Sequence, residues 1–219
     1  MTDGIILIDK PAGMTSFGVV ARIRRVLSER AGKKVKVGHT GTLDPFATGL
    51  MILCVGKECK NAGHYTKLDK VYEATIRLGQ TSSTGDPEGE ITDISDIQPK
   101  NDEIETALVG FKGKIEQTPP VYSAIKIDGQ RAYNLARQGK QVDMPSRTVT
   151  VYSLEATDYT YPNLKIRTNV SSGTYIRSLA QDIGDTLGTG AYCTQLRRIT
   201  IADWSIVDAQ TLNDYGVTD

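Results

Sequence analysis

The pattern of apolar and polar positions along this chain predicts several strands. Residues 4–10 contain a short apolar run and residues 50–55 a continuous one, as expected of buried strands. Residues 70–79 alternate with a period of two, which places Tyr72 at the start of an inward face. Further strands are predicted on both sides of a turn at residues 161–163 and from residue 194 onward.

The same pattern predicts helices between these strands. The longest follows Thr15 or Ser16, either of which can cap it, and ends at Gly32. Its apolar positions recur at helical spacing and are Phe17, Val20, Ile23 and Leu27. Shorter helices are predicted within residues 56–67, 101–110, 131–139 and 173–188.

Size and composition place the chain among ordinary soluble proteins. Its 219 residues, 39% of them hydrophobic, suffice for one large domain or two intimate ones. The N-terminal apolar run is too short and too quickly charged to be a secretion signal or a membrane span, so we expect a cytoplasmic protein. Three cysteines without a C-x-x-C pair, and only two histidines, predict neither a disulfide framework nor a metal site.

Charge is segregated along the chain, although the formal net charge is zero. Residues 1–70 carry 12 Lys/Arg against 6 Asp/Glu, and residues 111–140 carry 6 against 2. Residues 71–110 carry 2 against 9. The basic segments are suited to a phosphate backbone, with an affinity that falls as salt rises. Charge alone is equally consistent with solvated helix faces.

One loop holds the strongest candidate for chemistry. Residues 38–50, Gly-His-Thr-Gly-Thr-Leu-Asp-Pro-Phe-Ala-Thr-Gly-Leu, place the carboxylate of Asp44 among glycines, threonines and a proline. Glycine allows close backbone approaches and Pro45 fixes φ directly after the acid, so the loop can hold Asp44 rigidly outward. Taken alone, the residues leave two interpretations open: a functional acid, or an Asx-turn that caps itself.

The string from Gly38 to Gly49 resembles the catalytic motif of the TruB family of pseudouridine synthases, which isomerise a uridine in the T-loop of transfer RNA. The resemblance implies that Asp44 is the catalytic residue. The stretch around Lys10, Asp-Lys-Pro-Ala-Gly, resembles a second family motif near the active site, which makes Lys10 a candidate site residue; alternatively it shields a strand end. Tyr72 matches the position at which the family stacks a tyrosine on the target base.

A third motif, Gly-Thr-Tyr-Ile-Arg at residues 173–177, contributes Tyr175 and Arg177. Arg177 falls in the first turn of a predicted helix, where the helix dipole disfavours a cation. The resemblance implies a reason for this position, because the family's arginine pairs with the catalytic aspartate and favours its ionised form. Sequence alone does not place Arg177 and Asp44 together.

The remaining expected RNA-binding residues are Leu196, His39 and Lys60. In the family, the leucine that matches Leu196 packs against the active site, although ordinary core packing would explain it equally well. His39 is expected against the RNA loop, filling the space that a flipped base leaves; the alternative is a histidine satisfied within its own loop. Lys60 lies on a polar, exposed helical segment.

The resemblance implies an α+β fold, the catalytic fold of pseudouridine synthases, with a mixed, mostly antiparallel sheet, flanking helices and a central active-site cleft. We expect residues 1–219 to form this catalytic domain without the C-terminal, PUA-like RNA-binding domain of many bacterial relatives. The expected substrate is the T-stem-loop of tRNA, with the uridine at tRNA position 55 as the target. We expect no membrane, metal or obligate protein partner.

Isomerisation of uridine breaks the N1–C1′ bond, turns the base and rejoins it through C5, so no cofactor is expected. The carboxylate of Asp44 acts either as a nucleophile at C1′ or as a base that gives a glycal intermediate, and the sequence leaves both routes open. A second hypothesis is an RNA-binding or tRNA-folding protein whose catalysis is incidental. A hydrolase with an aspartate nucleophile is disfavoured, since no second acid follows Asp44 two residues on.

Overall fold

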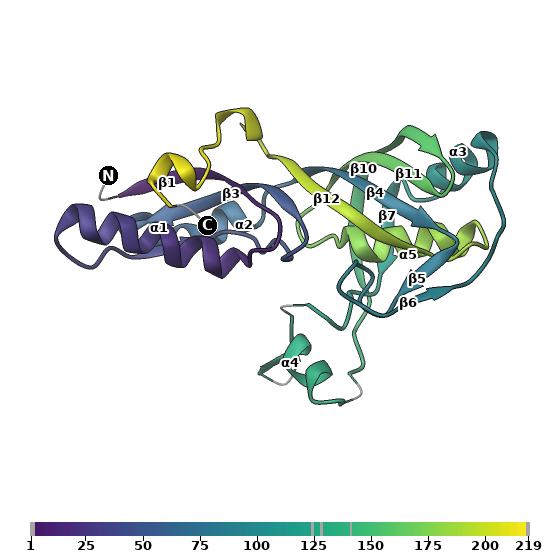
Figure 1. Ribbon diagram of the computed structural model, residues 1–219, viewed down its shortest axis with the longest axis horizontal. Helices are drawn as coiled ribbons and strands as arrows, with labels where there is room; N and C mark the ends of the chain where they lie inside the picture. The colour runs from purple at the N-terminus through teal and green to yellow at the C-terminus, as the bar shows by residue number, and fades with distance from the viewer. Residues whose placement is uncertain (1–2, 124, 128, 141, 218–219) are drawn as a thin grey trace. The chain divides into compact units, whose positions relative to one another are not determined.

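The computed structural model describes residues 3–123, 125–127, 129–140 and 142–217 (Figure 1). The chain folds as two compact units: unit 1 runs to Tyr72 and resumes at Arg197, and unit 2 is Glu73–Leu196. Within the described ranges, no helix is long and apolar enough to cross a membrane. The outermost residues of the predicted domain, 1–2 and 218–219, lie outside these ranges.

The sheet of unit 1 is built on β3 (Thr48–Val55), which is buried along almost its whole length. Strand β1 (Gly4–Lys10) pairs antiparallel with it over seven residue pairs, from Gly4 with Val55 to Lys10 with Gly49. Apolar side chains on both faces of β3 explain why its sequence is continuously hydrophobic. The other strands of this unit are β2 (Val37–His39), antiparallel to β3, the end of β12 (Ala191–Ile201), parallel to β3, and β13 (Trp204–Ser205).

Unit 1 also carries the longest helix, α1 (Ser16–Ala31), which lies along the sheet in Figure 1. Thr15 is its N-cap, with its side chain accepting from the Gly18 N–H, and Gly32 ends it in the left-handed conformation, as predicted. The expected inward position of Phe17 is wrong: Phe17 is 64% exposed, and Val19 takes a buried place instead. Shorter helical segments follow at η1 (Gly56–Lys60), α2 (Ala62–Thr66), η2 (Ile206–Asp208) and η3 (Asn213–Tyr215).

In unit 2 the strand order is β12-β4-β11-β10-β7, and the pairs of β10 with β11 and with β7 are antiparallel. The predicted strand at residues 70–79 is β4 (Lys70–Leu78), and its buried positions alternate as expected. The predicted turn at residues 161–163 joins β10 (Arg147–Thr160) to β11 (Asn163–Val170). The remaining strands are β5 (Gln80–Ser82), β6 (Ile91–Asp93), β7 (Gly113–Gln117), β8 (Lys126–Ile127) and β9 (Gln130–Arg131).

Three helices belong to unit 2: α3 (Asn101–Val109), α4 (Ala132–Arg137) and α5 (Ile176–Thr186). Lys100 is the N-cap residue of α3, and the Glu103 carboxylate accepts from the Lys100 backbone N–H at 2.6 Å. Helix α5 begins at Ile176, so Tyr175 is its N-cap residue. The mixed, mostly antiparallel sheet with flanking helices confirms the predicted α+β fold class.

Candidate active site

The Asp44 loop, defined here as residues 40–47, connects β2 to β3 within unit 1. Its first residue is anchored on the sheet, because the Thr40 N–H and hydroxyl both donate to the Ile52 carbonyl, at 3.2 and 3.3 Å. Its last turn is closed by the Ala47 N–H, which donates to the Asp44 carbonyl at 3.1 Å. Asp44 itself is half-buried. The loop is therefore tied to β3 at one end and turned tightly just after the carboxylate.

The two residues that flank Asp44 are both held by the segment that leads into α1. The buried hydroxyl of Ser16 donates to the Leu43 carbonyl at 2.9 Å and accepts from the Leu43 N–H at 2.8 Å. On the other side, the Gly13 N–H donates to the Pro45 carbonyl at 2.8 Å. Such contacts hold the main chain on either side of Asp44 and reduce the conformational freedom of the loop.

Lys10 joins this support from the end of β1. Its ammonium donates to the carbonyls of Pro11 at 2.8 Å, Met14 at 2.6 Å and Pro45 at 3.2 Å, and the residue is fully buried. Burying an ammonium is costly unless its donors are used, as these are. The structure thus places Lys10 against the carbonyl of Pro45, the residue after Asp44, and contact between Lys10 and RNA stays a prediction.

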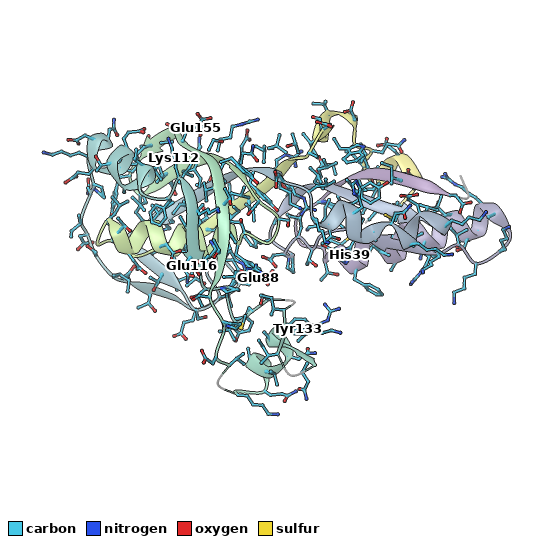
Figure 2. The ribbon with its side chains drawn as sticks, turned by 180° about the vertical axis from the view of Figure 1, so that it is seen from behind. His39, Glu88, Lys112, Glu116, Tyr133 and Glu155 are labelled. Atoms are coloured by element: carbon cyan, nitrogen blue, oxygen red, sulfur yellow. The ribbon has the colours of Figure 1, made fainter. Side chains whose placement is uncertain are left out.

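The other predicted residues of unit 1 are His39, Lys60 and Tyr72. His39 is half-buried at the end of β2, directly before the Asp44 loop (Figure 2). Lys60 is exposed at the end of η1. Tyr72 is buried on the inward face of β4, with 7% of its surface exposed. Their predicted contacts with RNA stay predictions.

In unit 2, Arg177 is buried in the first turn of α5, where acceptors from three other residues of the unit hold its guanidinium. Its guanidinium donates to the Asp86 carboxylate at 3.0 Å, to the Thr84 carbonyl at 2.8 Å and to the Tyr122 carbonyl at 2.7 Å. The pair with Asp86 is nearly inaccessible to water, at 3% and 5% side-chain exposure. This carboxylate supplies a structural reason for a cation at an unfavourable helix position. The pairing of Arg177 with Asp44, which belongs to the other unit, stays a prediction.

Asp86 is not among the site residues predicted from the sequence. It is buried, with 4% of its surface exposed. Its carboxylate accepts from the Thr84 hydroxyl at 2.6 Å and from the Glu88 N–H at 3.1 Å, while Ser82 donates to its backbone carbonyl at 2.5 Å. An Asp among Ser, Thr and Gly is a signal for such an Asx-type turn. Nothing local indicates a partner 91 residues further along the chain.

Tyr175 is positioned by two neighbours in unit 2. The Gln117 amide bonds the Tyr175 main chain twice, accepting from its N–H at 2.7 Å and donating to its carbonyl at 3.0 Å. The Arg147 guanidinium carbon lies 4.9 Å from the centre of the Tyr175 ring, within cation–π range. Leu196 is buried in β12 and is the last residue of unit 2 along the chain. Whether Tyr175 and Leu196 contact a target base stays a prediction.

The sequence of the chain matches a known protein family over most of its length. Residues 24–176 match the family model described as TruB family pseudouridylate synthase (N terminal domain). The chain belongs to this family. The matched range contains the Asp44 loop, Tyr72 and Asp86, and it ends one residue before Arg177.

Individual relatives agree with the family match. A protein named tRNA pseudouridine synthase B from Burkholderia lata is 43% identical over 213 residues, covering 97% of this chain and 65% of that protein. A protein of the same name from Opitutus terrae is 43% identical, covering 96% of this chain and 86% of that protein. The chain thus spans about two thirds of the length of the first of these relatives.

Among solved structures, one described as a Cbf5-Nop10-Gar1 complex matches with a TM-score of 0.75 and 30% identity, covering 97% of this chain and 53% of that chain. A second, an H/ACA RNP bound to a substrate RNA containing 2′-deoxyuridine, matches with a TM-score of 0.71 and 28% identity, covering 96% of this chain and 51% of that chain. The family match and the similarity to these structures together support the pseudouridine synthase fold.

Proposed function

We propose that this chain is a tRNA pseudouridine synthase that isomerises the T-loop uridine at tRNA position 55, and that it works in the cytoplasm. One observation carries the proposal: Asp44 lies in the family's motif, and hydrogen bonds hold the residues on both sides of it. The names of the TruB relatives, at 43% identity, support tRNA as the substrate.

The reaction proceeds on a uridine turned out of its RNA stack, at a cost of about a few kcal/mol. Tyr72 stacks on the flipped base and returns about 1 to 3 kcal/mol of that cost. The N1–C1′ bond breaks, the base turns, C5 bonds to C1′, the C5 proton leaves to solvent and N1 takes up a proton. Asp44 acts on the ribose, either by attacking C1′ or by removing a ribose proton. No redox partner is needed, since the product is an isomer of the substrate.

The other residues hold the parts of this reaction in place. Arg177 provides a positive charge that favours the ionised form of Asp44. His39 fills the space that the base leaves, and Lys60 contacts the phosphate backbone. Tyr175 and Leu196 line the pocket of the target base. Lys10 acts through the main chain of the Asp44 loop.

The test uses an unmodified tRNA transcript that carries tritium at C5 of its uridines. Wild-type protein is expected to release tritium to water, whereas Asp44→Asn, which keeps the shape and removes the charge, is expected to release none above background. Asp203→Asn, an exposed carboxylate of the same unit, serves as the matched control and is expected to behave as wild type. Equal release by wild type and Asp44→Asn would refute the catalytic assignment. Bound RNA without release by wild type would favour an RNA-binding or tRNA-folding protein.

A further inference from the structure

Arg198 is a buried cation whose function the proposed reaction does not yet explain. It lies in the part of β12 that belongs to unit 1, and only 1% of its surface is exposed. Its hydrogen-bond partners are main-chain carbonyl oxygens: Nε donates to Leu50 at 2.6 Å and Nη2 donates to Gly41 at 3.2 Å. Because burying a guanidinium is expensive, its position indicates a geometric role.

The two carbonyls lie on opposite sides of Asp44 along the chain. Gly41 is the second residue of the loop, and Leu50 lies in β3, three residues after the loop ends. A planar guanidinium holds its donors in a fixed fork, so it fixes the separation of the two oxygens it bonds. Arg198 therefore closes the loop at its base, while Asp44 lies between the two bonded positions.

Glycines lie where the main chain of the loop and of β3 approaches Arg198. A Cβ built on Gly41 would lie 3.5 Å from Nη1 of Arg198, which is ordinary contact. A Cβ on Gly49 would lie 2.4 Å from the Arg198 carbonyl oxygen and 2.6 Å from its nitrogen, and Gly49 has a φ of +109°. β12 consequently approaches β3 closely enough for the side chain of Arg198 to reach back to Leu50.

A second buried cation makes the placement of Arg198 more costly. The side chain of Lys70 also lies near Gly41, with its Cε 3.8 Å from the position of a Cβ on that residue. Burial first, and the charge of Arg198 second, lower the pKa of Lys70 to about 8. The Lys70 ammonium is held by the carbonyls of Thr66 and Leu68. The protein thus keeps a guanidinium beside the loop although a neighbouring cation opposes it.

We propose that Arg198 is a positioning residue for Asp44: by bonding the Gly41 and Leu50 carbonyls, it holds the loop in the geometry that the isomerisation needs. This inference rests on the proposed function. It gives Arg198 a role distinct from RNA binding, since its donors face main-chain oxygens inside unit 1. Loss of the guanidinium should therefore slow the reaction of bound RNA without weakening the binding of RNA.

The experiment compares three variants of the full chain. Arg198→Met removes the donors and keeps a similar apolar stem, and Arg198→Lys keeps the charge but loses the fork. The matched control is Arg197→Met, the preceding residue on β12, whose side chain is 39% exposed and pairs with Asp9 at 2.6 Å. Each variant is measured for its single-turnover rate at saturating enzyme, its Kd for an unmodified T-stem-loop RNA, its thermal unfolding, and the amide hydrogen exchange of residues 41–50.

The rate of Arg198→Met is expected to fall by about 10- to 100-fold, because a misplacement of about 1 Å can cost that much. Its Kd is expected to stay within about twofold of wild type, as catalysis and binding separate when only positioning is lost. Arg198→Lys should recover part of the rate, and Arg197→Met should match wild type. Amides of residues 41–50 should exchange faster in Arg198→Met than in Arg197→Met at a temperature where both are folded.

Two results would overturn the inference while leaving the proposed function intact. One is an Arg198→Met rate equal to that of Arg197→Met, and the other is a loss of RNA affinity as large as the loss of rate. If Arg198→Met fails to fold, Arg198→Lys carries the same comparison, and a wild-type rate and exchange pattern in that variant would overturn the inference. A wild-type protein that binds the RNA without converting it would instead overturn the proposed function, and the inference with it.

Discussion

The buried ion pair of Asp86 with Arg177 offers a sharp test of how unit 2 is stabilised. In Asp86→Asn the side chain keeps its size but loses its charge and one of its acceptor oxygens. The Asp86 carboxylate accepts from Arg177 at 3.0 Å, from Thr84 at 2.6 Å and from the Glu88 N–H at 3.1 Å. At least one donor loses its partner in a site that is 5% exposed or less. Breaking a buried pair by removing one partner costs about 3 to 5 kcal/mol, so we expect the free energy of unfolding to fall by about 3 kcal/mol.

A surface pair of the same chemistry in the same unit provides the control. Arg167 and Glu73 also form an ion pair, at 2.6 Å, but their side chains are 42% and 48% exposed. Water and salt screen such a pair, so Glu73→Gln should cost at most about 1 kcal/mol. Urea unfolding followed by far-UV circular dichroism measures both variants, with equal slopes required for the comparison.

The difference between the two variants in lost free energy of unfolding tests whether the buried ion pair stabilises unit 2. If Asp86→Asn costs no more than Glu73→Gln, the buried pair does not stabilise unit 2 in the way its geometry indicates. The rate of tritium release provides a second measurement. Because Asp86→Asn removes a carboxylate that holds the Arg177 guanidinium, we expect slower release at a temperature where the variant is folded, with Glu73→Gln unaffected.

Two further predictions concern unit 1 and the pH dependence of stability. Gly49→Ala should destabilise the protein by about 3 kcal/mol or more, because its Cβ would lie 2.4 Å from the Arg198 carbonyl oxygen at a φ of +109°. The control is Gly63→Ala, where the added Cβ meets open space. If urea unfolding shows that Gly49→Ala loses no more free energy of unfolding than Gly63→Ala, this reasoning is refuted. Burial, and secondarily Asp185, raise the pKa of Asp182 from 3.8 to about 6, so its ionised form opposes folding at neutral pH. Asp182→Asn should therefore raise the free energy of unfolding at pH 7 by about 1 kcal/mol after allowance for partial exposure, and the gain should shrink as pH falls through 6 and vanish below about 4. A gain that is constant across this range would contradict the assigned cause.

Local patterns in the sequence determined the secondary structure well. The caps of α1 at Thr15 and Gly32, the burial of β3 and the alternation of β4 were all predicted, because each depends on residues a few positions apart. The motif around Asp44 likewise identified the family, since its residues are contiguous. In α1 the helical spacing of apolar residues did not identify the buried face correctly. It predicted Phe17 to be buried, although Phe17 is exposed.

Only the tertiary structure decided which distant residues support the candidate site. Ser16 reaches Leu43 across 27 positions, Lys10 reaches Pro45 across 35, and Arg198 reaches Leu50 across 148. These contacts depend on the order and register of the strands, which periodicity within one segment does not specify. The sequence alone could propose Asp44 as the catalytic residue, but the buried groups that hold its loop became identifiable only when the fold brought them to main-chain carbonyl oxygens on either side of Asp44.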